Sequence, residues 1–187
     1  MKTMNLNAIL ILSLVVFIFA SCKKDQEPMV LAPQNVTVEY LDSLASPINT
    51  LSTGQNYSVG YQFRPKINGK ITELSVNLPN AGDYKISIWD VDTQTLLTQT
   101  TINQAYGNWA NKDIPDLALE AQKTYAISFL LPATDYYYVD NLTLPVDMTN
   151  ITIINSIAAN GDGYPVDQTF TDHLFGFVDL TFQADPQ

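Results

Sequence analysis

The sequence predicts an all-β protein, an antiparallel β-sandwich of jelly-roll-like kind with about eight to ten strands. Three observations lead to this fold class. Apolar residues alternate with polar ones over several short stretches, as in strands that bury one face. Turn-forming clusters such as residues 80–83 and 160–163 separate these stretches. No stretch carries the i, i+3, i+4, i+7 apolar pattern of an amphipathic helix.

The expected strands follow one another from residue 36 to residue 182. Each is recognised by apolar residues at every second position, which would form one row on one face of a sheet. In chain order the rows are Val36, Val38 and Tyr40; Val59, Tyr61 and Phe63; Leu74, Val76 and Leu78; Tyr84, Ile86 and Ile88; residues 96–102; Tyr125, Ile127 and Phe129; Ile151 and Ile153; and Val178, Leu180 and Phe182. Residues 117–122 are the one helix candidate, and they are too few to hold a helix without packing support.

The N-terminus has the features of an exported lipoprotein. Lys2 precedes an apolar run over residues 8–20, which is too short to span a bilayer and has the length of a signal-peptide core. Residues 19–22, Phe-Ala-Ser-Cys, resemble the bacterial lipobox, and the Lys-Lys-Asp that follows resembles lipoproteins of the Bacteroidota type. A plain secretory signal with an incidental cysteine is the alternative.

The lipobox resemblance, the charged and proline-containing stretch after it and the length of the remaining chain together imply three segments. We expect a lipoprotein signal peptide over residues 1–21, an acylated Cys22 with a tether over residues 22–35, and a single β-sandwich domain over residues 36–187. The protein would then be an outer-membrane lipoprotein that faces the periplasm or the cell surface. The protein would bind the membrane through its N-terminal lipid anchor.

The charge and the cysteine content exclude several functions. The formal net charge is −10, so a nucleic-acid backbone would be repelled and no nucleic-acid partner is expected. Cys22 is the only cysteine, so an acylated chain has no disulfide, and only His173 remains as a nitrogen ligand for zinc. No cofactor is expected, apart from calcium, which binds through oxygen alone.

Two acidic loops are the candidate calcium sites. Asp90 and Asp92 lie in one loop, and Asn160 and Asp162 lie in the other. Each loop offers side-chain and carbonyl oxygens within a few residues, although both are ordinary tight-turn sequences as well.

We expect no catalysis. His173 is the single histidine and no nucleophile-elbow sequence accompanies it, so a Ser-His-Asp triad has little support. A glycoside hydrolase needs two carboxylates at a fixed separation, and with nineteen acids some pair always meets that distance. The four glutamates form no paired-acid motif.

The aromatic residues are the candidate ligand contacts. Tyr136, Tyr137 and Tyr138 are consecutive, so in an alternating strand at least one of them points away from the core. Trp89 shares a strand face with Lys85 and Ser87, so it is either exposed or covered by a loop, whereas Trp109 is expected to seal the edge of the sandwich. An exposed aromatic ring can stack on the apolar face of a sugar, although packing is the commoner role of such residues.

From about residue 57 to residue 182 the order of landmarks resembles the bacterial domain of unknown function 4082 family. The landmarks are Gly-Tyr-Gln-Phe at 60–63, Gly-Lys-Ile-Thr-Glu-Leu at 69–74, Tyr-Lys-Ile-Ser-Ile-Trp-Asp at 84–90 with Leu96 and Leu97, Gly-Asn-Trp at 107–109, Leu-Ala-Leu at 117–119, Lys-Thr-Tyr-Ala-Ile-Ser at 123–128, Gly-Tyr-Pro at 163–165 and Phe-Val-Asp-Leu-Thr-Phe at 177–182. Lys123 stands where the family usually has glycine, and residues 49–55 are not recognisable. The resemblance implies a small β-sandwich without established enzymatic activity, found beside glycosidases, adhesins and carbohydrate-binding modules.

Taken together, the sequence predicts a lipid-anchored, non-catalytic binding or adhesion module of the cell envelope, with carbohydrate as the favoured ligand class. A structural envelope protein that mediates protein–protein contacts is the first alternative, and it predicts a large exposed apolar patch. An acid-dependent glycoside hydrolase is the second, and it predicts two carboxylates with raised pKa values in one cleft.

Overall fold

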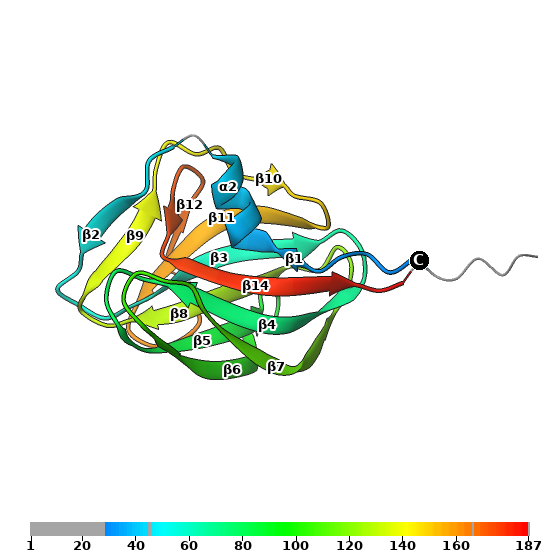
Figure 1. The fold of residues 1–187 in the computed structure, drawn as a ribbon, viewed down its shortest axis with the longest axis horizontal. Coiled ribbons are helices and arrows are strands. Elements are labelled where there is room, and N and C mark those ends of the chain that lie inside the picture. Colours follow the sequence, from blue (N-terminus) through cyan, green and yellow to red (C-terminus); the bar gives the residue numbers. More distant parts are fainter. Residues whose placement is uncertain (1–28, 45, 166, 187) are drawn as a thin grey trace, which may run out of the picture.

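Strands dominate this computed structural model, which describes residues 29–44, 46–165 and 167–186 (Figure 1). In chain order the strands are β1 (Gln34–Asn35), β2 (Asn49–Ser52), β3 (Tyr57–Pro65), β4 (Gly69–Asn77), β5 (Gly82–Asp90), β6 (Thr95–Gln104), β7 (Ala110–Leu119), β8 (Tyr125–Leu131), β9 (Asp135–Val139), β10 (Val146–Asp147), β11 (Ile151–Asn160), β12 (Gln168–Phe170), β13 (Leu174–Phe175) and β14 (Phe177–Ala184). One helix, α2 (Val36–Ser43), accompanies them. The expected signal peptide and Cys22 lie outside the described residues.

The strands form three antiparallel sheets, which confirms the predicted sandwich. The four-stranded sheet has the order β1-β14-β4-β7, and the seven-stranded sheet has the order β10-β11-β3-β8-β5-β6 with β12 added to β11. A three-stranded sheet, β13-β9-β2, extends the sandwich at one end. No helix in the described part of the chain is long and apolar enough to cross a bilayer.

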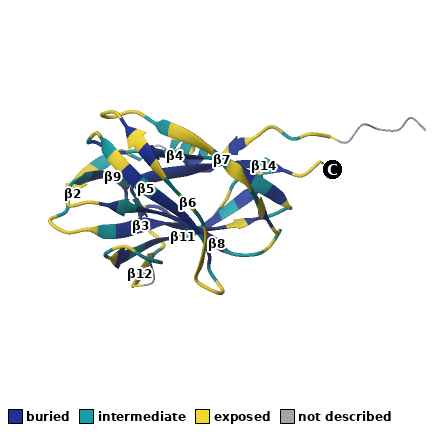
Figure 2. Cartoon of the chain, turned by 90° about the horizontal axis from the view of Figure 1, so that it is seen from below, coloured by how far each residue is buried: buried dark blue, intermediate teal, exposed yellow. Residues whose placement is uncertain are grey.

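The core lies between the two larger sheets, where their apolar rows meet. The alternation in the sequence marks the inward faces correctly: Tyr61 and Ile127 of the seven-stranded sheet and Leu74 and Leu180 of the four-stranded sheet are all fully buried. Figure 2 shows the result as dark strand interiors with exposed turns at their tips. The strand pattern therefore follows directly from the hydrophobic periodicity.

Residues 36–40 differ from the prediction, because they belong to a helix and not to a strand. In α2 the buried residues are Val36, Thr37 and Tyr40, which is helical spacing. The amides of Thr37 and Val38 donate to the carboxylate of Asp179 on β14. This acceptor satisfies the first turn of the helix from a distant part of the chain, and local alternation carries no sign of it.

Residues 117–122, the one helix candidate, form no helix, because residues 117–119 belong to strand β7. Leu117 and Leu119 are its last residues, and Glu120 follows it. Pro115 lies inside β7, which is tolerated because β7 is the outer strand of the four-stranded sheet and pairs only with β4.

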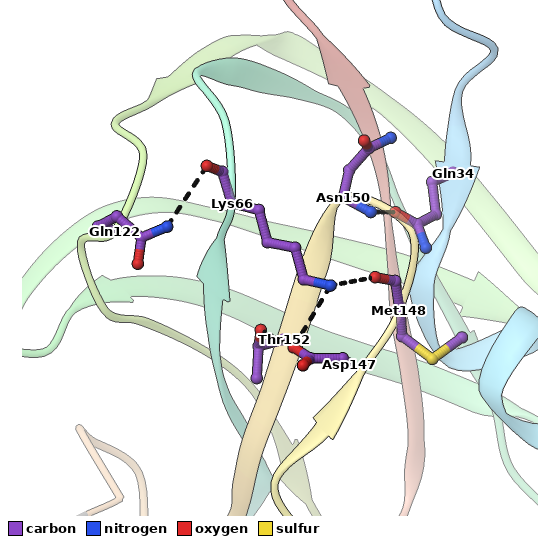
Figure 3. Close-up of polar contacts among 7 residues, drawn as sticks. All are labelled: Gln34, Lys66, Gln122, Asp147, Met148, Asn150 and Thr152. Carbon is purple, nitrogen blue, oxygen red and sulfur yellow. Dashed lines mark hydrogen bonds and ion pairs between the residues drawn. The ribbon is translucent and has the colours of Figure 1, made fainter.

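A polar cluster fixes the end of the sandwich where the N-terminal arm docks (Figure 3). The Lys66 Nζ donates to the carbonyl of Met148 at 2.7 Å and lies 3.3 Å from an oxygen of Asp147. Nearby, the amide of Asn150 donates to the side chain of Gln34 at 3.0 Å. Gln34 is buried and belongs to β1, so the expected tether over residues 22–35 includes two residues that are part of the folded domain.

The two ends of the sandwich are therefore different. In Figure 1 the described chain enters, and the C-terminus leaves, at the right-hand end. Strands β2 and β9 lie at the left-hand end. The N-terminal arm and these two strands therefore lie at opposite ends of the domain.

Candidate binding pocket

A half-open pocket of about 490 Å³ lies between the three-stranded sheet and the adjoining end of the seven-stranded sheet. Its volume is in the range of about 300–1,000 Å³ that is usual for small-molecule sites. Four aromatic residues line it: Tyr57, Tyr136, Phe170 and Phe175. Its aliphatic residues are Leu51, Val59, Leu131 and Ala158. Its polar side chains are Ser52, Thr53, Gln55, Asn160 and Gln168.

The aromatic wall is held together by ring contacts. Phe170 and Phe175 meet edge to face with centroids 4.7 Å apart, and Tyr136 meets Phe175 at 6.4 Å and 70°. His173 stacks behind Phe175 at 5.4 Å and 13°, and its Nδ1 lies 2.7 Å from Asp172 Oδ1. The histidine packs on Phe175 without lining the pocket, and the Asp172 carboxyl has a lowered pKa because of its contact with His173.

A glycine directs Phe175 into the pocket. Gly176 has φ +62°, and its amide donates to the carbonyl of Tyr137 where the chain passes from β13 to β14. The turn sends Phe175 to the pocket and Phe177 to the interior, where Phe177 stacks on Tyr137 at 5.5 Å. Two aromatic residues on either side of one glycine therefore belong to the pocket and to the interior.

One comparison with known proteins identifies a family. The family model described as domain of unknown function (DUF4082) matches residues 44–173, which is more than half of the chain. The chain belongs to this family. No curated protein matches the chain.

In this DUF4082 protein the family match ends before β13 and β14. Phe175 and the inner strand β14 nevertheless complete the pocket and the sandwich. Helix α2 also lies outside the matched residues. The folded unit is therefore larger than the matched segment on both sides.

The tyrosine triplet divides between pocket and packing. Tyr136 lines the pocket and is buried. Tyr137 is packed on Phe177, and Tyr138 is half-buried with its ring 6.4 Å from that of Tyr136. The structure places only one of the three predicted tyrosines in the pocket lining.

The two tryptophans take part in packing. Trp89 lies on the outer face of β5, where its Nε1 donates to Ser128 Oγ at 2.9 Å. The ring of Tyr164, from the loop after β11, covers it edge-on at 5.8 Å. Trp109 stacks on Phe177 at 6.5 Å and 14°.

The acidic loops are occupied by internal contacts. Asp90 accepts from the amide of Thr93 at 3.1 Å and pairs with Lys123 at 2.7 Å, and these contacts lower the pKa of its carboxyl. Asp162 pairs with Lys85, and Asp92 is exposed. Among the described residues no group of three or more His, Cys, Asp or Glu is placed to hold a metal ion. Asn160, from the second loop, lines the pocket instead.

Replacing Asp90 with alanine is expected to lower the free energy of unfolding by about 1–3 kcal/mol, because a buried turn cap and an ion pair are lost together. Because the Asp90 pKa is lowered in the folded state, this stabilisation is present above the ordinary carboxyl pKa and is lost as the pH falls through the folded value. Urea denaturation at several pH values measures both effects. Asp92→Ala, in the same loop but exposed, is the matched control and should change stability by less than about 0.5 kcal/mol. Equal effects of the two substitutions would contradict this role for Asp90.

Sequence reasoning did not find most of the pocket. Phe170, Phe175 and Gln168 lie on strands of only two or three residues, too short to show alternation. Strand β2 falls in residues 49–55, where no family landmark was recognised. The only signal was the density of aromatic residues from Tyr136 onward.

Proposed function

We propose that this protein is a non-catalytic carbohydrate-binding module, held at the outer membrane by a lipid on Cys22. The observation that carries the proposal is the pocket, with its four aromatic rings and its ring of uncharged polar side chains. Aromatic faces stack on the C–H face of a sugar ring, and amides and hydroxyls bond its hydroxyl groups. A pocket with only aromatic rings or only polar side chains would match a sugar less well than one that has both.

The position of the pocket supports its presentation away from the membrane. The N-terminal arm runs into the right-hand end of the domain in Figure 1, and the pocket is built around β2, β9 and their neighbours at the other end. A lipid at Cys22 would therefore attach the domain by the end remote from the pocket. Ligands in the surroundings would meet the open end first.

The side chains that line the pocket favour binding over reaction. They include no aspartate, glutamate or histidine, so paired carboxylates for glycoside hydrolysis have no place in it. In the described part of the chain Asp179 has a carboxyl with a raised pKa; it is buried under α2 and accepts three backbone hydrogen bonds. Its environment accounts for a structural role, and it is not among the residues that line the pocket.

The protein-contact alternative has weaker support. The large apolar residues that are exposed in the described chain belong to separate segments. They are Met29 and Val30 in the N-terminal arm, Ile48 and Leu51 at β2, Leu96 and Leu97 on β6, and Tyr106 after β6. Exposed apolar residues in separate segments are common on protein surfaces and do not by themselves define an interface.

A binding experiment on the full chain in detergent tests the proposal. Glycan-array screening followed by calorimetry should find at least one bound sugar, and Phe170→Ala should weaken its binding about tenfold or more, because one wall of the pocket is removed. Phe170 is half-buried, so this substitution spares the central core. Tyr106→Ala removes an aromatic ring that is 73% exposed and outside the pocket lining, and it should leave affinity unchanged. Background signal for every glycan would refute the proposal.

A further inference from the structure

We infer that the pocket selects uncharged sugars and excludes sugars that carry carboxylate or sulfate groups. This inference rests on the proposed function, and it adds the chemical subclass of the ligand. It is carried by the charges in and around the pocket. Three observations on the described residues lead to it.

The first observation is the neutrality of the lining. Its polar side chains carry amides or aliphatic hydroxyls, and Tyr57 and Tyr136 add two phenol groups. Burial raises the pKa of Tyr136, so its phenol is neutral at physiological pH. Gln55, Asn160 and Gln168 each provide both a donor and an acceptor, which matches the two-way hydrogen bonding of sugar hydroxyls.

The second observation is that every cation of the described chain is engaged outside the pocket. Lys66, Lys70, Lys85 and Lys123 form ion pairs with aspartates. Arg64 donates to Thr124 Oγ1 at 3.2 Å, and Lys112 donates to the carbonyl of Thr101 at 3.0 Å. None of these six residues lines the pocket. An anionic group in the pocket would have no cation to pair with.

The third observation is that two residues adjacent in sequence to the lining are acidic. Asp135 directly precedes Tyr136, and Asp167 directly precedes Gln168. Asp167 lines a small adjoining cavity, and its Oδ2 accepts from the backbone amide of Asn160 at 3.2 Å. With a formal net charge of −10 for the whole chain, the field at the mouth opposes an approaching anion.

The consequence is a penalty that an acidic sugar meets twice. Its charge is repelled on approach, and inside it is partly desolvated among aromatic rings without a counterion. A neutral sugar of the same size keeps the stacking and the amide hydrogen bonds and meets neither penalty. A cationic sugar escapes the repulsion, but no carboxylate lies in the lining to pair with it.

The test compares neutral, acidic and amino forms of oligosaccharides of equal length and linkage, using the full chain in detergent. The probes carry glucose, glucuronate or glucosamine at the same position. We expect the neutral form to bind at least tenfold more tightly than the acidic form, with the difference shrinking as salt is raised. Equal or tighter binding of the acidic or the amino form would overturn the inference and leave the proposed function standing. Absence of binding for all three, in a protein that also gives no signal on the glycan array, would refute the proposed function itself.

A charge introduced at the pocket mouth provides the second arm. Gln168 is exposed, so its substitution should not disturb folding. Gln168→Lys should raise affinity for the glucuronate probe about tenfold, because it supplies the missing counterion. Gln168→Met, of similar length and without charge, is the matched control and should give no such gain. Discrimination in the unmodified protein without any gain for Gln168→Lys would overturn the electrostatic basis of the inference.

Discussion

Gly60→Ala is expected to lower the free energy of unfolding by about 3 kcal/mol or more. Gly60 lies in the middle of β3, buried, with β11 on one side and β8 on the other. A Cβ at this position would overlap the carbonyl oxygen of Ile127 and lie 2.8 Å from the Cα of Ser128. Both are backbone atoms, so no side-chain rotation can make room.

Movement of β8 cannot relieve this overlap, because its other edge is paired with β5 at Ser87. The cost would therefore spread over three strands of the seven-stranded sheet. Urea denaturation followed by tryptophan fluorescence measures it. Gly163→Ala is the matched control, since a Cβ there has no atom within 4 Å and its backbone requires no positive φ. A loss below about 1 kcal/mol for Gly60→Ala would show that the strands are less tightly fixed than this packing implies.

The hydrophobic alternation predicted most reliably those strands that have one face in the common core. Tyr84, Ile86 and Ile88 of β5 are an example: all three are buried, and the intervening Lys85 is half-buried. Strand β7 was not predicted, because it is an exposed edge strand. Most of its residues are open to solvent, and only Leu119 is buried. Periodicity can reveal a strand only when one of its faces is covered.

The pocket was harder to predict than the fold, because it depends on pairings between distant segments. Leu51 of β2 lies opposite Tyr136 of β9, and Phe170 of β12 lies opposite Ser156 of β11. These short strands have no pattern of their own, and their positions follow from the larger sheets. The sequence marked Tyr136 as an aromatic residue in a strand. It could not show which residues share the pocket with Tyr136, because most of them are distant in sequence.

Asp179 shows the same dependence on distant contacts, and it carries the second large effect. Its Oδ1 accepts from the amides of Thr37 and Leu180, each at 2.7 Å, and its Oδ2 accepts from Val38 at 3.1 Å. It is 2% exposed, and no ion pair joins it to a cation of the described chain. A carboxylate from β14 thus caps α2 and holds the N-terminal arm on the sandwich.

Burial raises the pKa of Asp179 to about 6 from its ordinary 3.8, and the backbone hydrogen bonds offset only part of this. The folded state therefore binds this proton more tightly than the unfolded chain does. The stabilising effect of this bound proton is complete below pH 3.8 and is lost as the pH rises through about 6. The free energy of unfolding should accordingly increase by about 1 kcal/mol from this group between pH 7 and pH 5, and by about 3 kcal/mol in total at lower pH.

Asp179→Asn isolates this contribution, because an amide of nearly the same shape cannot titrate. The general relief of negative charge on acidification acts on the unmodified protein and on the variant alike, so their difference in unfolding free energy reports Asp179 alone. We expect that difference to shift by about 1 kcal/mol in favour of the unmodified protein between pH 7 and pH 5, measured by urea denaturation in matched buffers. A difference that does not vary with pH would mean that the three amide donors offset the cost of burial completely. A shift in the opposite direction would mean that the donors stabilise the carboxylate more than burial disfavours it. In that second case the helix cap would act as an anion site whose stabilising effect falls on acidification.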